Sequence, residues 1–177
     1  MRYHPNDRPW QQLHLWQQLA VTLIAKHQLN SRQALAFLLL ADNVGQPTSS
    51  GPSAEPLRLL VTGPGGTGKS RIFEAWTEFH KEIQRTEEFR LTAPTGVVAS
   101  DIGGCTIHSE AALCVSRKNL LARTAGGSKI REALESRFAM LKTLVVDEIY
   151  FMSAKDISIL SENCSIAKGN AEHVFGG

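Results

Sequence analysis

The sequence lacks several features that would place it in a protein class at once. Its three cysteines, Cys105, Cys114 and Cys164, are odd in number and have no metal-ligand spacing, which favours a reducing compartment over a disulfide scaffold. The longest apolar run, Ala34–Ala41, has eight residues, whereas a bilayer-spanning helix needs about 20. The first residues, Met1–Pro9, contain no apolar core of a signal peptide. We therefore expect no membrane partner.

The sequence also carries little net charge and no internal repeat. Its net charge is +2 over 177 residues, so composition alone does not indicate a nucleic-acid partner, which has to be inferred from local motifs. Hydrophobic residues make up 42% of the chain, enough for the core of one soluble domain with an extension. The oligomeric state has no signature in the sequence.

One segment carries a complete phosphate-binding motif, Gly-x-x-x-x-Gly-Lys-Ser. It follows an apolar run predicted to be a buried strand, Leu57–Thr62, and precedes a predicted helix, Lys69–Gln84, whose charged outer face includes Glu74 and Glu78. A strand, a glycine-rich turn and a helix form the context in which this motif binds a nucleoside triphosphate. The residues predicted to hold the nucleotide are Gly63, Pro64, Gly65, Gly66, Thr67, Gly68, Lys69 and Ser70.

The residue types of this loop explain its expected chemistry. Glycines let the backbone curl so that several N–H groups point inward at a phosphate, and the following helix adds its positive N-terminal dipole. Lys69 can bridge phosphate oxygens, and the Ser70 hydroxyl can bind Mg²⁺. The alternative is an ordinary glycine turn between a strand and a helix, which the Lys-Ser pair and the flanking patterns disfavour.

The other segments alternate between helix and strand patterns. Before the loop we expect an amphipathic helix with apolar positions from Trp10 to Ile24, a second helix from Ser31, its N-cap, to Asp42, and a linker at Asn43–Pro56. After the loop, the predicted elements are a strand at Phe89–Thr92, a small-residue helix from Gly96 to Ile102, a short helix at Thr106–Leu113, a loop at Arg117–Lys129, a helix at Ile130–Leu141, a strand at Thr143–Val146 and a helix capped by Ser153 that ends near Ile166.

This alternation indicates a fold class. An all-apolar strand such as Thr143–Val146 is typical of a parallel sheet covered on both faces. We therefore expect a three-layer α/β fold of the P-loop NTPase kind, in which ligands bind at the carboxyl ends of the strands. In this division, residues 1–56 form a helical extension and linker, and residues 57–177 form the nucleotide-binding domain.

Two acidic residues, Asp147 and Glu148, follow directly on the strand at Thr143–Val146. A carboxylate at the end of a strand beside a phosphate loop can hold Mg²⁺ through water, and we assign this role to Asp147. Glu148 can orient and deprotonate the attacking water. The alternative is a pair of surface acids that open the next helix. With the phosphate loop upstream, Lys69, Asp147 and Glu148 predict Mg²⁺-dependent hydrolysis of ATP.

Further segments closely resemble the petite-integration-frequency family of DNA helicases. The most specific is Leu91–Ser109, with an Ala-Pro-Thr-Gly turn followed by Gly-x-Thr-Ile-His-Ser. Val145–Ser153 is similar to the family's Val-Asp-Glu-Ile-Ser-Met-x-Ser block, and Leu29–Gln33 to its Leu-Asn-x-x-Gln adenine-reading motif. The final residues, Ala167–Gly177, resemble the version of the family carried by Helitron-like transposons.

The resemblance implies a superfamily-1 motor with a RecA-like ATPase domain, which uses ATP and Mg²⁺ to move 5′ to 3′ along single-stranded DNA and to open forks. The implied processes are DNA repair, recombination and telomere maintenance, in the nucleus or, as the alternative, in the mitochondrion. The resemblance also implies that Gln33 reads the adenine edge. The residues that it places against the DNA strand are Pro94, Thr95, Gly96, Thr106 and His108.

Backbone N–H groups and hydroxyls at those positions can grip phosphates without reading sequence, as a translocating motor requires. Without the resemblance, His108 is better explained as a capping or packed histidine. The alternative for Gln33 is a solvated helix residue.

The chain departs from the family pattern at three places. Tyr150 and Phe151 stand beside the acidic pair where the family has Ser-Met, and Val98 replaces a small alanine. After Gly177 the family continues into a Gly-Asp-x-x-Gln-Leu-Pro-Pro segment and a second motor domain, which would supply an arginine finger. We therefore expect this chain to be half a motor that binds ATP but has lost coupled unwinding.

Two other functions compete with the helicase. One is a truncated, catalytically inert nucleotide-binding remnant of a transposon helicase, favoured by the substitution at Tyr150 and Phe151. The other is a different phosphate-loop ATPase, such as a clamp loader or a small-molecule kinase. Such enzymes have no reason to carry the Ala-Pro-Thr-Gly and Thr-Ile-His-Ser blocks.

Overall fold

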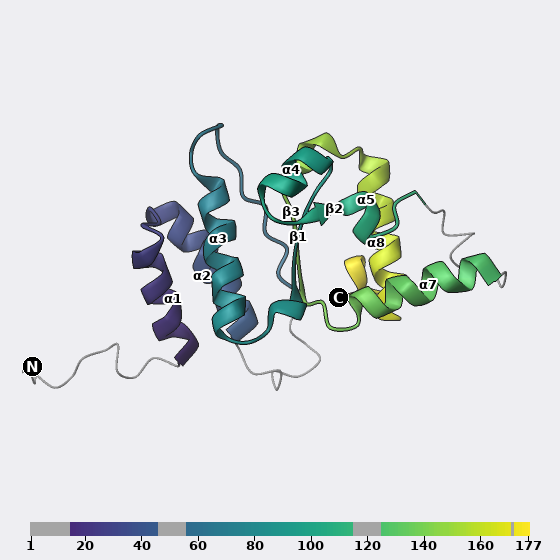
Figure 1. Cartoon of the computed structure of the whole chain (residues 1–177), viewed down its shortest axis with the longest axis horizontal. Helices are drawn as coiled ribbons and strands as arrows, with labels where there is room; N and C mark the ends of the chain where they lie inside the picture. Colours follow the sequence, from purple (N-terminus) through teal and green to yellow (C-terminus); the bar gives the residue numbers. More distant parts are fainter. Residues whose placement is uncertain (1–14, 46–55, 115–124, 171) are drawn as a thin grey trace, which may run out of the picture. The chain divides into compact units, whose positions relative to one another are not determined.

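The computed structural model describes residues 15–45, 56–114, 125–170 and 172–177. These residues belong to two compact units, Met1–Thr86 and Glu87–Gly177. The described part of the first unit is helical, and the second unit contains a parallel sheet with helices (Figure 1). This structural division lies inside the predicted nucleotide-binding domain, so the phosphate loop belongs to the same unit as the N-terminal helices.

Three helices that pack against one another build the described part of the first unit: α1 (Leu15–Lys26), α2 (Ser31–Gly45) and α3 (Lys69–Glu82). The rings of Phe37 and Phe79 are fully buried and meet edge to face, with centroids 5.9 Å apart. The indole Nε1 of Trp76 donates to the backbone oxygen of Phe37 over 3.3 Å. Burial of these large aromatic side chains fixes α3, which begins at the phosphate loop, against α2.

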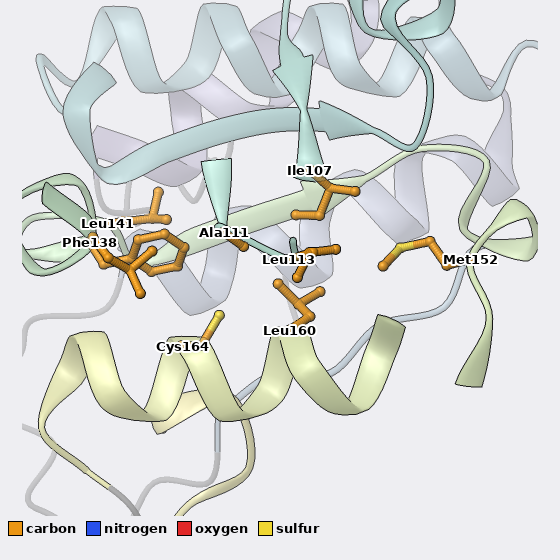
Figure 2. Close-up of a cluster of buried hydrophobic side chains, with 9 residues drawn as sticks. Ile107, Ala111, Leu113, Phe138, Leu141, Met152, Leu160 and Cys164 are labelled. Carbon is orange, nitrogen blue, oxygen red and sulfur yellow. The ribbon is translucent and has the colours of Figure 1, made fainter. Parts of the chain in front are cut away.

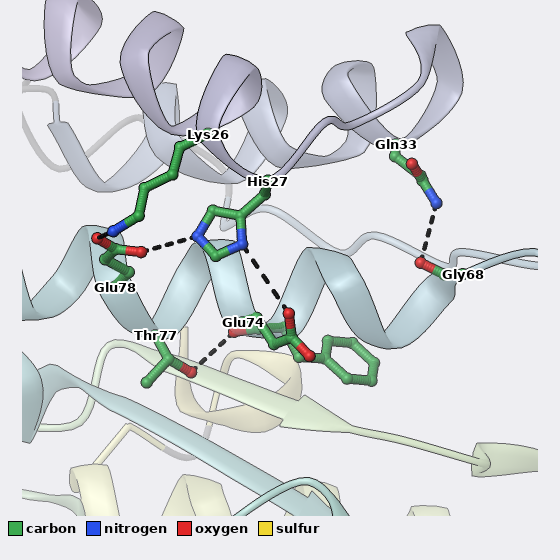
Figure 3. Close-up of polar contacts among 8 residues, drawn as sticks. Lys26, His27, Gln33, Gly68, Glu74, Thr77 and Glu78 are labelled. Atoms are coloured by element: carbon green, nitrogen blue, oxygen red, sulfur yellow. Dashed lines mark hydrogen bonds and ion pairs between the residues drawn. The ribbon is translucent and has the colours of Figure 1, made fainter.

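A cluster of charged side chains joins the end of α1 to α3 (Figure 3). Glu78 accepts a hydrogen bond from the Lys26 ammonium, and its Oε2 lies 2.8 Å from Nε2 of His27. Nδ1 of the same ring lies 3.9 Å from Oε2 of Glu74. The hydrogen bonds from Lys26 and His27 lower the pKa of Glu78. The charged face of α3 is therefore partly a contact with α1, not the wholly outer face that the sequence predicted.

The cap of α2 is one residue earlier than predicted. Oδ1 of Asn30 accepts from the backbone N–H groups of Arg32 and Gln33 at 3.1 and 3.0 Å. Asn30 is thus the N-cap, and Ser31, the predicted cap, is the first helical residue. Asparagine and serine are comparable caps, so the sequence could not decide between these neighbours.

The other helix bounds of this unit differ in part from the prediction. α2 runs to Gly45, beyond the predicted end at Asp42, and residues 46–55 of the predicted linker lie outside the described residues. In α1, Ala20 and Leu23 are buried, as the apolar spacing predicted. The part of the predicted helix around Trp10 also lies outside the described residues.

The apolar run Leu57–Thr62, predicted as a strand, is not a strand in the structure. Its residues belong to no helix or strand, and Leu60 is 69% exposed. A strand needs a neighbour that shares its backbone hydrogen bonds, and the described part of the first unit contains no strand to pair with it. The apolar pattern indicated burial, but this unit provides no pairing partner.

The second unit contains a parallel sheet in the strand order β2–β1–β3. The strands are β1 (Phe89–Ala93), β2 (Cys105–Thr106) and β3 (Thr143–Val146). β1 and β3 confirm two predicted strands, whereas β2 was not predicted. Gly104 allows β2 to approach β1, because a Cβ at this position would lie 2.3 Å from the backbone oxygen of Leu91.

Helices and short 3-10 turns accompany these strands. They are η2 (Thr86–Glu88), α4 (Gly96–Asp101), α5 (Ile107–Glu110), α7 (Ala125–Phe138), η3 (Ile149–Phe151), α8 (Ala154–Lys168) and η4 (Val174–Gly176). Because α7 begins at Ala125, the predicted loop at Arg117–Lys129 is wrong over residues 125–129, and residues 115–124 lie outside the described part. None of the described helices has the length and apolar character needed to cross a membrane.

The core of the second unit lies between the sheet and helices α7 and α8 (Figure 2). Phe138 of α7 and Leu160 and Cys164 of α8 are buried there, and side chains of β3 pack against them. Burial raises the pKa of the Cys164 thiol to about 12, so this cysteine is an uncharged packing residue. Ser153 caps α8 as predicted, in a capping box with Asp156.

Candidate functional site

The phosphate loop, Gly63–Ser70, leads directly into α3. Gly66 and Gly68 have φ angles of 74° and 76°, in the left-handed region that glycine adopts most readily. The first turn of α3 contains no acidic side chain, and Gly68 at its N-cap position makes no side-chain cap. The N–H groups at the start of this helix are therefore suited to bind an anion.

Two side chains of the loop bond to the loop's own backbone. Oγ1 of Thr67 donates to the oxygen of Pro64 over 2.8 Å, and Nζ of Lys69 donates to the oxygens of Gly63 and Pro64 at 2.9 and 3.1 Å. The lysine ammonium thus lies against the loop. Phosphate oxygens are charged and form stronger hydrogen bonds than these carbonyls, so a triphosphate can compete for the same ammonium.

Gln33 of α2 contacts this loop. Its Nε2 donates to the backbone oxygens of Thr67 and Gly68 at 3.0 and 2.9 Å, and its Oε1 accepts from the N–H of Asn30 at 2.8 Å. The residue is only 9% exposed, so the alternative of a solvated helix residue is wrong. The contact with adenine stays a prediction.

The acidic pair is positioned by the sheet of the second unit. Asp147 follows β3, and its backbone N–H donates to the oxygen of Thr92 in β1 over 2.8 Å. Thr92 is fully buried, and its hydroxyl donates to the backbone oxygen of Val145 over 2.7 Å. Oδ1 of Asp147 accepts from the N–H of Glu148 at 2.9 Å. Thr92, to which the sequence assigned no role, therefore joins β1 to β3 just before the acidic pair.

Glu148 is the N-cap residue of the turn η3 and has a φ of 51°, a left-handed conformation that costs a glutamate roughly 1–3 kcal/mol and is concentrated at functional sites. Its Oε2 is buried and has no hydrogen-bond partner among the described residues. An orphaned carboxylate oxygen of this kind fits a group that binds a water molecule.

The bulky residues Tyr150 and Phe151 lie beside Glu148 but do not enter the core. They are 73% and 62% exposed, with ring centroids 4.7 Å apart. A hydrogen bond with the Glu148 carboxylate raises the pKa of Tyr150. This departure from the family pattern therefore adds a hydroxyl contact to the acidic pair and little buried volume.

The predicted DNA-contacting residues lie at the carboxyl edge of the same sheet. Pro94, Thr95 and Gly96 follow β1, and Thr106 ends β2 in register with Ala93. Since parallel strands end at one edge, these residues share that edge with the acidic pair. The hydroxyl oxygens of Thr95 and Thr106 cap α4 and α5, and each hydroxyl keeps a hydrogen that can be donated to a phosphate.

His108 lies in α5 and is half-buried. Hydrogen bonds with Ser153 and, to a smaller extent, the charge of His108 lower the pKa of Asp156. The cap of α5 is Thr106 and not this histidine, and a DNA contact by His108 stays a prediction.

Polar side chains that the sequence analysis missed hold α5 in place. Glu110 accepts from Nε of Arg90 at 3.0 Å and from Sγ of Cys105 at 3.5 Å. Arg137 of α7 donates to the backbone oxygens of Ser109 and Glu110 at 2.6 and 3.0 Å. The Arg90–Glu110 and Arg137–Ser109 partners are 20 and 28 residues apart in the chain, so no local pattern pointed to them.

Within the described ranges, no group of three or more His, Cys, Asp or Glu side chains could enclose a metal ion. Mg²⁺ does not need such a cage, because it is usually held by one or two protein oxygens together with waters and nucleotide phosphates. Ser70 in the first unit and Asp147 in the second are donors of that kind. The donor types fit Mg²⁺ carried by a nucleotide, and the role of each residue stays a prediction.

Comparison with known proteins decides the family. The sequence model of a family described as PIF1-like helicase matches residues 28–177, a stretch that contains the phosphate loop, the acidic pair and the predicted DNA-contacting residues. The chain belongs to the PIF1-like helicase family. Its fold class is therefore the predicted one, an α/β P-loop NTPase fold of the RecA-like kind. The described residues contain three parallel strands of its sheet, consistent with an incomplete domain of this kind.

Several named helicases are similar to this PIF1-like chain. "ATP-dependent DNA helicase PIF6" of Trypanosoma brucei brucei is 30% identical over 126 residues, which cover 67% of this chain and 15% of the relative. "ATP-dependent DNA helicase PIF1" of Saccharomyces cerevisiae is 34% identical over 97 residues, 55% of this chain and 11% of the relative. "ATP-dependent DNA helicase Pif1" of Psychrobacter sp. is 25% identical over 119 residues, 67% of this chain and 18% of the relative.

The matched part of this chain thus spans less than one fifth of the length of each of these relatives. No solved structure matches the chain.

Proposed function

We propose that this chain binds ATP with Mg²⁺ and forms the nucleotide-binding part of an ATP-dependent DNA helicase that moves 5′ to 3′ along single-stranded DNA. The observation that carries this proposal is the phosphate loop, in which left-handed Gly66 and Gly68 bring backbone N–H groups and Lys69 to the start of α3. Family membership supports a helicase role, and the names of the relatives support ATP as the fuel.

In this proposal each unit supplies its own set of groups. The first unit supplies the N–H groups of the loop, the ammonium of Lys69 and the hydroxyl of Ser70. The second supplies Asp147, which would hold Mg²⁺ through water, and Glu148, which would orient and deprotonate the attacking water. When bound, Mg²⁺ neutralises phosphate charge that would otherwise repel the nucleophile.

The DNA strand is the proposed partner of the sheet's carboxyl edge in the second unit. The backbone at Pro94–Gly96 and the hydroxyl of Thr106 can bind phosphates, which do not carry sequence information. Action at forks, roles in repair, recombination and telomere maintenance, and location in the nucleus, with the mitochondrion as the alternative, are proposed from the family resemblance.

ATP turnover of the purified chain, with and without single-stranded DNA, tests this function. We expect Lys69→Ala to remove ATP binding, because the loop loses its only side-chain cation. Glu148→Gln should keep ATP binding and slow turnover by about a hundredfold or more, the usual effect of losing a general base.

Two exposed residues of α3 provide matched controls, since Lys81→Ala and Glu82→Gln make the same chemical changes away from the loop. Turnover that persists in Lys69→Ala, or ATP affinity unaffected by it, would contradict the proposal.

A nucleotide-binding module without turnover is the second candidate. The hydrogen bond of Tyr150 with Glu148 favours it, because this contact engages the carboxylate expected to activate water. Under this alternative, the unaltered chain and Glu148→Gln bind ATP alike and neither hydrolyses it, with or without DNA. If Tyr150→Phe then restores turnover, the tyrosine is the cause of the inactivity.

A further inference from the structure

The side chain of Gln33 bonds to the phosphate loop at two successive peptide groups. Figure 3 shows the side chain reaching from α2 toward the carbonyl of Gly68. The amide nitrogen donates to Thr67 and Gly68 at 3.0 and 2.9 Å. Gly68 is needed for this approach, because a Cβ at that position would lie 2.7 Å from the same nitrogen. The contact therefore depends on both residues.

These two bonds fix the directions of the loop's N–H groups. A trans peptide is planar, so its C=O and N–H point in opposite directions, and the described residues contain no cis peptide bond. Holding the oxygen of Thr67 toward Gln33 turns the N–H of Gly68 away from it. Holding the oxygen of Gly68 toward Gln33 likewise turns the N–H of Lys69 away from Gln33. Both donors are then directed away from α2 at the start of α3.

Gln33 is itself held in place. Its Oε1 accepts from the N–H of Asn30, and the Asn30 side chain accepts in turn from the N–H of Gln33 at 3.0 Å. With 9% of the residue exposed, the amide has little freedom to rotate. Both ends of the amide are thus engaged by the protein.

We propose that Gln33 is a positioning residue that orients the N–H donors of the phosphate loop toward a triphosphate. This inference rests on the proposed ATP site and assigns Gln33 a role that does not depend on the base. An amide recognises adenine through one donor and one acceptor at once. The NH₂ group has two hydrogens, and both are donated to the loop, so Gln33 would have to release one of these bonds to read adenine in that way.

The two roles predict different ligand dependence, which calorimetry can separate. The titrants are ATP, GTP and inorganic tripolyphosphate, each with Mg²⁺, and the proteins are the full chain and its Gln33→Ala and Gln33→Glu variants. A positioning role predicts that both variants bind all three ligands with lower affinity, by a similar factor of about ten for two lost hydrogen bonds. The ratio of ATP to GTP affinity stays unchanged.

Two results would overturn the inference. One is a loss of affinity for ATP alone, with unchanged affinity for GTP and tripolyphosphate, which would show that Gln33 recognises the adenine base. The other is unchanged binding of all three ligands. Gln18→Ala, at an exposed glutamine of α1, is the matched control and should leave every affinity unchanged. Thermal unfolding of each variant shows whether the fold is intact.

A measurement without nucleotide separates this inference from the ATP site on which it rests. The ¹⁵N order parameters of Gly68 and Lys69 report fast motion of the loop. We expect them to fall in Gln33→Ala and to stay as they are in Gln18→Ala. Unchanged order parameters in Gln33→Ala would overturn the positioning role even if ATP binds. If the unaltered chain binds no triphosphate, the proposed function fails, and the order parameters alone decide whether Gln33 holds the loop.

Discussion

The phosphate loop and the acidic pair each follow an apolar run, but different forces position them. The acidic pair continues strand β3, and a backbone bond from Asp147 to Thr92 extends the pairing with β1. The loop follows Leu57–Thr62, which is not a strand, and bonds from Gln33, Thr67 and Lys69 shape it.

This difference shows which changes should disturb the loop and which should disturb the acidic pair. Many backbone hydrogen bonds hold the strands of a sheet together, and no single side chain is needed for them. The position of the acidic pair should therefore change mainly when the packing of the sheet changes. The loop depends on the side chains of Gln33, Thr67 and Lys69, and therefore on the helices α2 and α3 that carry the first and the last of them. Single substitutions in the first unit should therefore disturb the loop directly.

The largest expected effect is that of Phe79→Ala, which removes a fully buried ring from the contact between α2 and α3. We expect the first unit to lose about 3–5 kcal/mol of stability. Hydrogen exchange, read peptide by peptide, measures this loss in each unit. Phe73→Ala, at a half-buried ring of the same helix, is the control with a smaller effect. A loss below about 1 kcal/mol for Phe79→Ala would show that this aromatic contact does not hold α3.

The substitution Gly104→Ala tests how closely β2 packs against β1 in the sheet. The new Cβ would meet the Leu91 backbone oxygen at 2.3 Å, so β2 has to move away from β1. Overpacking of this kind costs about 1–3 kcal/mol, which denaturant unfolding of the second unit measures. At Gly96 a Cβ meets no atom within 4 Å, so Gly96→Ala should be close to neutral. Equal stabilities for the two variants would contradict this account of β2.

The smallest effect concerns the charged contact between α1 and α3. The pKa of Glu78 is lowered from 4.5 by Lys26 and His27, so its carboxylate stabilises the fold above the unfolded-state pKa and loses this contribution as the pH falls through the folded-state value. We expect Glu78→Gln to lower the stability of the fold by about 0.5 kcal/mol at neutral pH. The stability of this variant should also decrease less steeply as the pH is lowered. Glu82→Gln is the control. If stability decreases as steeply with falling pH in Glu78→Gln as in the unaltered chain, the stabilising role assigned to the Glu78 carboxylate is contradicted.

The sequence predicted those parts of the fold that depend on local chemistry. Ser153 caps α8 as predicted, and the apolar run Thr143–Val146 is a strand. The run Leu57–Thr62 has the same character but is not a strand, because pairing depends on a neighbour and not on the run itself. β2 escaped prediction for a related reason, since it is two residues long and exists only by its register with β1.

Prediction of the candidate site from the sequence had the same limit. The phosphate motif and the acidic pair were visible because their residues are adjacent in the chain. The contact of Gln33 with Gly68 spans 35 residues and that of Thr92 with Val145 spans 53. Such contacts follow from how helices and strands pack, so a pattern search along the chain does not reveal them.

The central proposal is that this chain binds ATP together with Mg²⁺, which Asp147 holds through water. The most direct test is the gain in ATP affinity that Mg²⁺ provides, measured by calorimetry in the unaltered chain, in Asp147→Asn and in Asp101→Asn, a control at an exposed aspartate of α4. We predict that Asp147→Asn reduces this gain by about tenfold or more, while Asp101→Asn keeps it. An equal gain from Mg²⁺ in all three proteins would contradict the proposed role of Asp147 in holding Mg²⁺.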